Sequence, residues 1–407
     1  MTVAETDISA TATTRIAHAR ILEPCLKVVE SHEALRGYID AWTHLATVAL
    51  EPNVFYEPWT LLPALDVLPE ARHVVFVLVF GRPDPSGPVA LTGFFPLFIR
   101  KLPYRIPISI ITTWIHKYCF LSVPLLHRDC ARQTLESFLT WLTTSPYNGR
   151  IFDLRLVPGD GPFQSLLAEL LTIHRRHSLI IRSFPRAVLR PPGTFEAYSD
   201  ALSGKLRREL KSKNKQLAEL GRYSYASVKT SAEVEEWVST FIRMEASGWK
   251  RKEGGSFSND SVGSDYLFRI LRNGLDQKRA LMTTSTLDSR PIAMQCTLLA
   301  NGGGFGFITT YDEAYAKYSP GALLTLENTR TFCDLPSLQW VDSCAQCDHP
   351  LFNRLWHGRR MVQRIIASDG TAFGNLLIAA SPQFRYLRDS FRKRRHFRLH
   401  SATHHPQ

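Results

Sequence analysis

The sequence predicts an α+β protein in which mostly antiparallel sheets carry helices on their faces. Two observations support this: hairpin-linked runs of apolar strands alternate with amphipathic helices, and the same order of elements occurs twice. The spacing repeats as well, because Pro124 follows Ser31 by 93 positions and Pro320 follows Ser231 by 89. A chain of 407 residues is long enough for two such domains.

The first repeat begins with an amphipathic helix over residues 31–50, whose apolar side chains recur at helical spacing. A second helical stretch and three strands joined by turns follow, over residues 55–114. A helix that starts at Pro124 then leads into a strand over residues 150–157. Because this helix crosses between two strands, those strands can lie parallel.

The second repeat follows the same plan. A helix over residues 231–250 and a second helix precede three strands, the last of which ends at Tyr311. A helix that starts at Pro320 leads into a strand over 338–345, and a basic helix over 202–220 precedes the whole repeat. The predicted organisation is a disordered tail, a first domain, a second domain and a basic tail, at residues 1–24, 25–190, 191–385 and 386–407.

Composition favours a cytoplasmic protein. Apolar runs are far shorter than the roughly 18–20 residues of a membrane-spanning helix, and the N-terminus has no secretory-signal pattern. The seven scattered cysteines do not suggest a disulfide framework. A formal net charge of +12 favours phosphorylated or polyanionic partners.

The segment Ser319-Pro320-Gly321 has the features of an anion-binding helix start. Pro320 suits the first helical position and Ser319 is a good N-cap. Gly321 lacks a β-carbon, so a ligand can approach the backbone. Main-chain amides at a helix N-terminus favour a phosphate or pyrophosphate.

Several segments resemble known acyltransferases. The strand-to-helix crossover with a phosphate-binding helix start resembles the GNAT acyltransferases, and the tandem plan resembles the Fem-type double-GNAT proteins. The segments "YDEAYAKYSPGALL", "MEASGWK", "DSCAQCDHPLFNRLW" and "LSGKLRREL" resemble the CelD/BcsL-like acetyltransferases of cellulose and exopolysaccharide biosynthesis. This resemblance covers about residues 25–385 and implies tandem GNAT-like domains.

The resemblance also implies an acyl-CoA co-substrate, with acetyl-CoA as the first candidate and no metal. It implies that Ser319, Gly321 and Ala322 present amides to the CoA pyrophosphate, flanked by Lys317 and Tyr318. The chain lacks the Q/R-x-x-G-x-G/A pattern of single-domain GNATs.

Acyl transfer needs a base for the acceptor and a donor for the oxyanion or thiolate. Asp342 ends the strand that follows the helix starting at Pro320, and it is the preferred base or substrate orienter. Its alternative role is that of a turn or cap residue. His349 ranks below it and can equally cap the next helix. Tyr311 and Tyr315 are candidate donors, with aromatic core packing as the alternative.

Acceptor contacts are expected from Glu245 and Trp249 at the end of the 231–250 helix, and Asp312 is expected to face the same cleft. Trp249 can form a cleft wall or anchor the core. The first repeat has no glycine after Pro124, which predicts a degenerate copy that contributes surface to the cleft. His116 is the residue of that copy chosen as a candidate substrate contact.

A Cys-x-x-Cys segment and a basic helix are two further candidate sites, and the sequence favours a structural role for both. Cys344-x-x-Cys347 beside His349 falls short of the four ligands of most structural zinc sites. The pattern of the basic helix over 202–220 predicts a helix that packs on the protein by its apolar side and exposes its basic side to solvent. Alternatively, the basic side binds CoA phosphates, an anionic glycan, an acidic membrane surface or nucleic acid. No RNA-binding aromatic motif accompanies it, so nucleic acid is not expected.

The sequence leaves three functions open. The first is acyl transfer from acyl-CoA to an amine or hydroxyl of a small molecule or glycan precursor. The second is the Fem-type reaction, in which an aminoacyl-tRNA supplies an amino acid to a peptide. The third is a non-catalytic interaction protein with two decayed GNAT-like domains.

Overall fold

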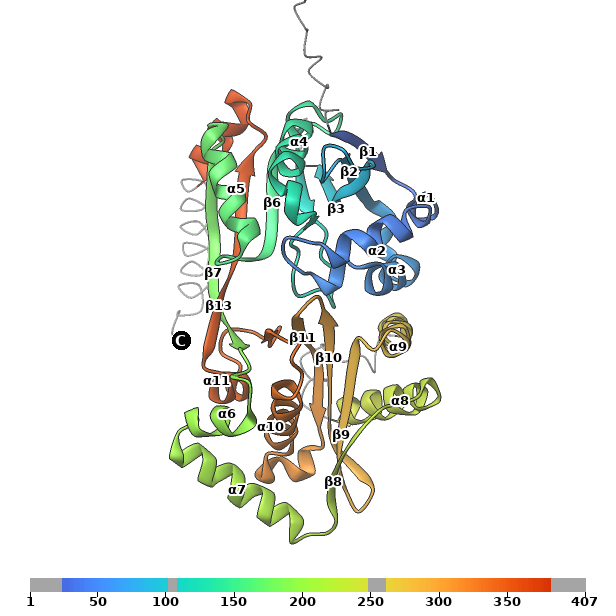
Figure 1. Cartoon of the computed structure of the whole chain (residues 1–407), viewed down its shortest axis with the longest axis vertical. Helices are drawn as coiled ribbons and strands as arrows, with labels where there is room; N and C mark the ends of the chain where they lie inside the picture. The colour runs from blue at the N-terminus through green and yellow to red at the C-terminus, as the bar shows by residue number, and fades with distance from the viewer. Residues whose placement is uncertain (1–23, 102–107, 248–260, 382–407) are drawn as a thin grey trace, which may run out of the picture.

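The structure is a computed structural model that describes residues 24–101, 108–247 and 261–381. Its strands form one mixed sheet in the order β1-β2-β3-β4-β6-β13-β7-β12-β11-β10-β9-β8, and β5 pairs with β3. The sheet extends along the long axis of the molecule and helices cover it in both halves (Figure 1). The predicted α+β architecture is therefore confirmed. Apart from Pro24, both predicted tails lie outside the described residues.

The described elements of each half follow one another in nearly the same order. Those of the first half are β1 (Cys25–Val29), α1 (His32–Arg36), α2 (Ile39–Thr47), α3 (Pro58–Val67), β2 (Val74–Gly81), β3 (Ala90–Lys101), β4 (Ser109–Thr113), β5 (Leu125–Leu126), α4 (Ala131–Thr144), β6 (Gly149–Pro158), α5 (Pro162–Ile173) and β7 (Ser178–Leu189). Those of the second half are α6 (Phe195–Ala201), α7 (Gly204–Ala218), β8 (Tyr223–Ser227), α8 (Ser231–Ser247), α9 (Ser261–Asp276), β9 (Ala280–Leu287), β10 (Arg290–Ala300), β11 (Gly303–Tyr311), the 3-10 helix η6 (Glu313–Tyr318), α10 (Pro320–Cys333), β12 (Trp340–Asp342), α11 (Pro350–Leu355) and β13 (Gly358–Ser368).

The predicted hairpins and crossovers are confirmed. β2, β3 and β4 pair antiparallel, as do β9, β10 and β11. Helix α4 crosses from β4 to a parallel β6, and α10 crosses from β11 to a parallel β12. The β11–β12 ladder is short, since it joins only Gly303–Phe305 to Trp340–Asp342. Beyond these residues the two strands no longer pair, which leaves room for a cavity.

The last strand of each half is inserted beside a strand of the other half. β13 lies between β6 and β7, and it pairs antiparallel with both. The end of β7, at Val188 and Leu189, pairs in turn with β12. Neither long strand is predicted from the sequence, and together they make the two sheets continuous. The predicted domain boundary, between residues 190 and 191, falls directly after β7.

Two helix predictions for the first half are wrong in detail. The predicted 31–50 helix is split into α1 and α2 at Gly37 and Tyr38, where glycine has a low helix propensity. The predicted helix start at Pro124 is absent, because Leu125 and Leu126 pair with Phe94 and Gly93 as β5. The helix starts instead at Ala131. None of the helices in the described ranges is long and apolar enough to cross a bilayer.

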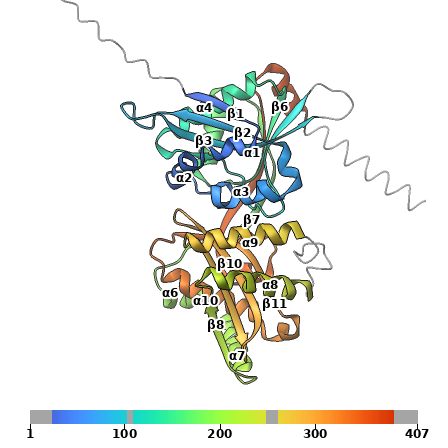
Figure 2. The same cartoon turned by 90° about the vertical axis from the view of Figure 1, so that its right-hand side faces the viewer.

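The two halves share a large aromatic and aliphatic core. Helix α3 of the first half packs against α9 of the second, and the two helices lie side by side in the view of Figure 2. Phe55 makes edge-to-face contacts with Phe305 at a centroid distance of 5.8 Å. Glu57, the residue directly before α3, is 2% exposed and forms an ion pair with Arg279 of the second half. The halves are therefore joined by buried contacts in addition to the inserted strands.

Glu51 is a buried carboxyl group at the start of α5, and it predicts a pH-dependent stability. The Phe163 amide donates to its Oε2 at 3.4 Å. Burial raises the pKa of Glu51 from 4.5 to about 7, although the charge of Arg360 opposes the increase. The folded protein therefore holds this proton more tightly than the unfolded chain does. The stabilisation is fully present below about pH 4.5 and is lost as the pH rises through about 7.

Glu51→Gln is expected to remove this contribution. The free energy of unfolding of the parent should fall between pH 4.5 and pH 8 by about 3 kcal/mol more than that of the variant. Urea unfolding across this pH range measures the difference, with the exposed Glu70→Gln as the matched control. Parallel pH profiles for the parent and Glu51→Gln would contradict the assignment.

Candidate active site

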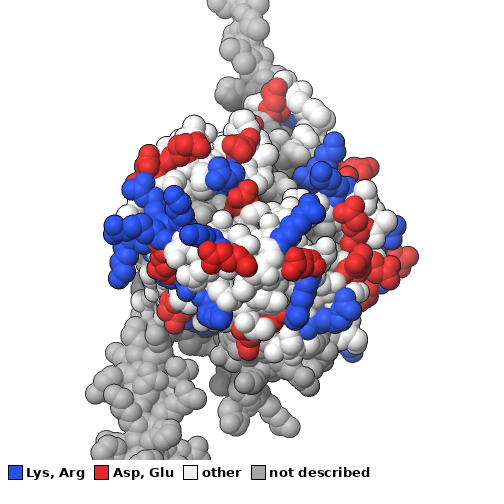
Figure 3. Space-filling view, turned by 90° about the horizontal axis from the view of Figure 1, so that it is seen from below, with Lys and Arg blue, Asp and Glu red and all other residues white. Residues whose placement is uncertain are grey.

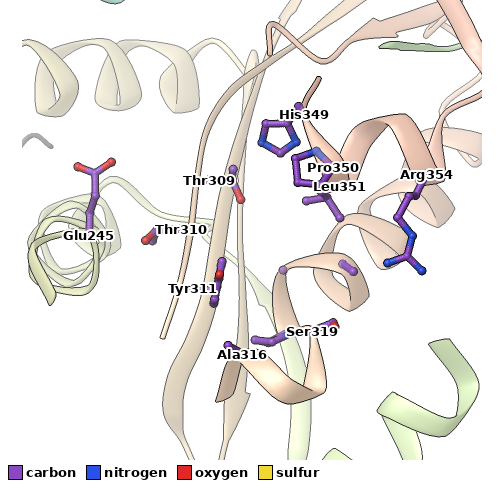
Figure 4. A pocket seen from close by; sticks show the side chains of 13 residues that line it. Glu245, Thr309, Thr310, Tyr311, Ala316, Ser319, His349, Pro350, Leu351 and Arg354 are labelled. Atoms are coloured by element: carbon purple, nitrogen blue, oxygen red, sulfur yellow. The ribbon is translucent and has the colours of Figure 1, made fainter. Parts of the chain in front are cut away.

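A cavity of about 470 Å³ opens where β11 ends and α10 begins. Its walls are the end of β11, part of η6, the start of α10, α11 with the residue before it, and the end of α8 (Figure 4). All of its lining residues belong to the second half of the chain. They are Glu245, Thr309, Thr310, Tyr311, Ala316, Ser319, Pro320, Gly321, Ala322, His349, Pro350, Leu351 and Arg354.

The start of α10 differs from an ordinary capped helix. Ser319 is at the N-cap position, as predicted, but its backbone is left-handed, with φ 55° and ψ 50°. A capping side chain normally needs an extended backbone, and accordingly the Ser319 hydroxyl makes no capping hydrogen bond. Left-handed backbone is costly for a residue with a β-carbon and often occurs at functional sites. The Ser319 side chain lines the cavity.

The main chain at this helix start offers fewer donors than the sequence suggests. The Ser319 amide donates to Ala316 O at 2.9 Å, and the Ala322 amide donates to Ser319 O at 3.0 Å. Pro320 has no N–H. Within the described part of the chain, the Gly321 amide donates to no group. Gly321 therefore provides the main-chain donor for an anion at this position.

The space above Gly321 is open to a ligand. A β-carbon placed on this residue would meet only the Tyr311 ring, at 3.6 Å, which is an ordinary van der Waals contact. The protein interior therefore does not require a glycine here. The glycine leaves room for a group that approaches the Gly321 amide closely, because a side chain would occupy part of the approach.

The parallel strands separate beside this cavity. Gly306 of β11 lies so close to the chain after β12 that a β-carbon would come within 2.9 Å of Ser343 O. Farther along β11, Thr309, Thr310 and Tyr311 face the cavity. The gap between the two strands thus opens toward the helix start.

The charged side chains lie at opposite sides of the cavity. Glu245, on α8, is 2% exposed, and Arg354, on α11, is hydrogen-bonded to Glu209 of α7 at 2.8 Å. Tyr311 and Ser319 lie between these two ends (Figure 4). His349 is half-buried, and its ring contacts Phe352 at a centroid distance of 4.9 Å. The cavity can therefore hold an anionic group near Arg354 and Gly321, and a basic acceptor group near Glu245.

The structure brings together six residues that the sequence predicts as functional. They come from α8, the end of β11, the start of α10 and the segment before α11, and they are Glu245, Tyr311, Ser319, Gly321, Ala322 and His349. Their spacing in the chain exceeds one hundred positions. Their roles in binding or catalysis remain predictions.

Asp342 lies outside this group. Its carboxylate is fully buried, accepts from the Cys344 amide at 2.8 Å and lies between Arg186 and Arg360, at 3.7 and 3.5 Å. Arg186 is on β7 and Arg360 is paired with it on β13. These contacts favour a structural role at the junction of the inserted strands, in line with the alternative turn role, and they leave no lining contact for an acceptor.

Other predicted residues are also outside the cavity lining. Asp312 pairs with Arg290 at 2.7 Å and caps η6, while Tyr315 packs on the core beside the same arginine. Lys317 and Tyr318 line a separate hollow between η6 and α7. Trp249 is outside the described residues.

His116 is buried between the two halves and does not reach the cavity. Its ring contacts Tyr266 of α9 at a centroid distance of 5.3 Å, and its Nδ1 accepts from the Tyr118 amide. Burial lowers the pKa of His116 to about 3, so it stays neutral. The segment around His116 thus contributes to the interface of the halves, and no first-half residue lines the cavity.

Three residues that line the cavity are not predicted as functional from the sequence: Thr309, Thr310 and Arg354. Thr309 and Thr310 are adjacent polar residues at the end of an otherwise apolar strand, and such a break in the pattern indicates that β11 leaves the core there. Arg354 had no local signal, since a basic residue in the last turn of a helix is ordinary.

The Cys344-x-x-Cys347 segment has no metal-like surroundings. Cys344 is buried and Cys347 is exposed. Burial, followed by the nearby Asp342 charge, raises the pKa of the Cys344 thiol. In the described ranges no three His, Cys, Asp or Glu side chains are placed to share a metal ion.

Comparisons with known proteins agree with this architecture. Residues 204–346 match the family model of an acetyltransferase (GNAT) domain, a range that begins at α7 and includes β11, α10 and β12. No curated protein matches the chain.

Solved structures extend the similarity to both halves. That of FemX has a TM-score of 0.54 at 7% identity, over 81% of this chain and 95% of that chain. A conserved protein of unknown function from Bacteroides thetaiotaomicron VPI-5482 has a TM-score of 0.50 at 9% identity, over 84% and 99%. A tandem GNAT protein from the clavulanic acid biosynthesis pathway has a TM-score of 0.42 at 14% identity, over 86% and 100%. At such identities, the similarity to the first two shows the fold alone.

Proposed function

We propose that this chain, whose residues 204–346 match an acetyltransferase (GNAT) domain, transfers an acyl group from acyl-CoA to an amine or hydroxyl acceptor. Acetyl-CoA is the first candidate donor. The proposal rests on one observation above all. The amide of Gly321, at the start of α10, donates to no group among the described residues, and Gly321 lines a cavity that lies where two parallel strands separate.

The residues at the start of α10 fit a diphosphate. The Gly321 amide and the Ser319 hydroxyl, which makes no capping bond, are the nearest donors, and Arg354 adds a positive charge. The Tyr311 ring and the alkyl parts of Pro320 and Leu351 offer an apolar wall for the rest of the carrier.

The thioester supplies an activated acyl carbon when the carrier is bound. The acceptor nitrogen or oxygen bonds to this carbon, the carbon–sulfur bond breaks, and the acceptor proton passes to a base. We assign the base to His349 or Glu245, because both line the cavity, and the proton donor for the departing sulfur to Tyr311. Glu245 lies at the side away from Arg354, where it can orient a basic acceptor (Figure 4).

His349→Ala is expected to lower kcat by about a hundredfold or more, since a positioned base contributes about 10²–10⁴. The affinity for acetyl-CoA should stay within about twofold. Release of free CoA thiol measures turnover and isothermal titration calorimetry measures binding. If kcat is unchanged, the base is Glu245 or another group, which Glu245→Gln then tests.

The direct test of the proposal is calorimetry with acetyl-CoA on the full chain. Binding distinguishes the acyl-CoA function from a non-catalytic protein. It also distinguishes it from the Fem-type alternative, which would show binding of aminoacyl-tRNA instead. Mass spectrometry of copurified ligands would identify the acyl group and the acceptor.

The wider setting belongs to the same proposal. The CelD/BcsL-like resemblance supports a glycan-precursor acceptor in polysaccharide biosynthesis. In this proposal the protein is cytoplasmic and associates peripherally with an acidic membrane surface. An acceptor screen of amino sugars and sugar hydroxyls, read by mass spectrometry, tests this assignment.

A further inference from the structure

One face of α7 carries a group of cations around a single carboxylate. Lys205, Glu209 and Lys213 are four positions apart, so their side chains lie along one face of the helix. Glu209 accepts from Arg354 at 2.8 Å. This hydrogen bond, followed by the charges of Arg354, Lys213 and Lys205, lowers the pKa of Glu209. Three positive charges therefore surround one negative charge.

This face connects two walls of the cavity. At one end, Arg354 belongs both to the cavity lining and to the pair with Glu209. At the other end, the Lys213 ammonium donates to Lys317 O at 2.5 Å, in the 3-10 helix that leads to Ser319. Lys213 and Lys317 also line a hollow of about 330 Å³ between α7 and η6. Arg354 thus lines the cavity, while Lys213 and Lys317 line the neighbouring hollow, beside the 3-10 helix that leads to α10.

Other Lys and Arg side chains lie on the same end of the molecule as α7 (Figure 3). Seen from the end of the molecule at which α7 lies, Lys and Arg side chains gather on the side where this helix begins (Figure 3). On the other side of α7, Leu206, Leu210 and Leu217 are buried in the core. The helix backbone is therefore held in place by its apolar side, while the lysine side chains extend from the opposite side.

We propose that Lys205, Lys213 and Lys317, with Arg354, form a site for the 3′-phosphate of CoA. The inference rests on the proposed function. An acyl-CoA carries a 3′-phosphate in addition to its pyrophosphate, and among the described residues at the start of α10 only the Gly321 amide is left as a free main-chain donor. A second phosphate must therefore be neutralised by side chains, and lysine ammonium groups bind phosphate as mobile point charges.

The test compares CoA with 3′-dephospho-CoA, by calorimetry on the full chain. The parent should bind dephospho-CoA about tenfold more weakly, because one charge-assisted contact at a partly exposed site is lost. Lys205→Gln/Lys213→Gln should bind CoA about tenfold more weakly than the parent does, and it should no longer distinguish the two ligands. Higher salt should reduce the parent's preference.

A matched control uses the other side of the same helix. Lys211→Gln/Lys215→Gln removes the same charge, but Lys211 lines a groove against α10 and Lys215 pairs with Glu219. This control should keep the preference for CoA. Equal affinities of the parent for CoA and dephospho-CoA would overturn the site and leave the proposed function intact. Loss of the preference in the control would also overturn it, whereas a parent that binds neither ligand would overturn the proposed function as well.

Discussion

Gly321→Asp is expected to lower the affinity for acyl-CoA by about a hundredfold or more, and to leave the protein folded. The new carboxylate would extend into the cavity beside the amide that we assign to the pyrophosphate. It would repel the phosphates and compete for their donor, and a charged hydrogen bond of this kind is worth about 1.5–3 kcal/mol. Calorimetry with acetyl-CoA measures the loss.

Folding should survive this change for two reasons. The β-carbon meets only the Tyr311 ring, at 3.6 Å, so no atom has to move. An acidic residue in the first turn of a helix is also favourable for the helix dipole. Gly321→Ala is the matched control, because it adds the same β-carbon without charge, and its affinity should fall by less than about tenfold. Parent-like affinity in Gly321→Asp would remove the cofactor assignment.

Asp342→Ala is expected to lower the free energy of unfolding by about 3–5 kcal/mol. The substitution leaves the guanidinium groups of Arg186 and Arg360, which are 3% and 11% exposed, without their shared carboxylate. Both arginines lie where β7 and β13 pair, so the cost falls on the junction between the halves. Urea unfolding at pH 7 measures the loss.

Asp153 offers a comparison within the same protein. It is buried on β6, the counterpart of β12, and it pairs with Arg364 of β13 at 2.7 Å. Arg364 is 39% exposed, so it can turn toward water when its partner is removed. Asp153→Ala should therefore cost less than Asp342→Ala. Equal costs would contradict the argument from burial.

The same residue also allows the catalytic hypothesis to be tested. Asp342→Asn keeps the shape of the side chain and removes its charge, so turnover can be measured on the folded fraction. Activity near that of the parent would exclude Asp342 as the base. A loss of turnover at full stability and full acetyl-CoA binding would restore that role.

Local features of the fold were predictable because they depend on near neighbours in the chain. The two three-strand hairpin series follow from apolar runs separated by turn residues. The start of α10 follows from Ser319 and Pro320, and the amphipathic α7 follows from leucines at helical spacing. The parallel strand pairs followed from the length of the crossovers between them.

The predicted helix start at Pro124 is wrong, whereas the role of Asp342 as the base stays a prediction; in both cases the deciding partners are distant in the sequence. Pro124 has the same local pattern as Pro320, yet the residues after it add a short strand to β3, a partner some thirty positions away. Asp342 ends β12, the strand that follows α10, and this position predicts it as a base. Its neutralising partners come from β7 and β13, and the sequence pattern predicts neither strand.

The sequence by itself determined the order of most helices and strands, the duplicated plan and the start of α10 at Pro320, since these depend on short-range periodicity and on backbone preferences of proline and glycine. Only the tertiary structure decided which acidic and basic side chains meet. Strand pairing between β7 and β13 joins residues about 180 positions apart, and burial then sets whether a carboxylate such as Asp342 binds two arginines or faces a ligand.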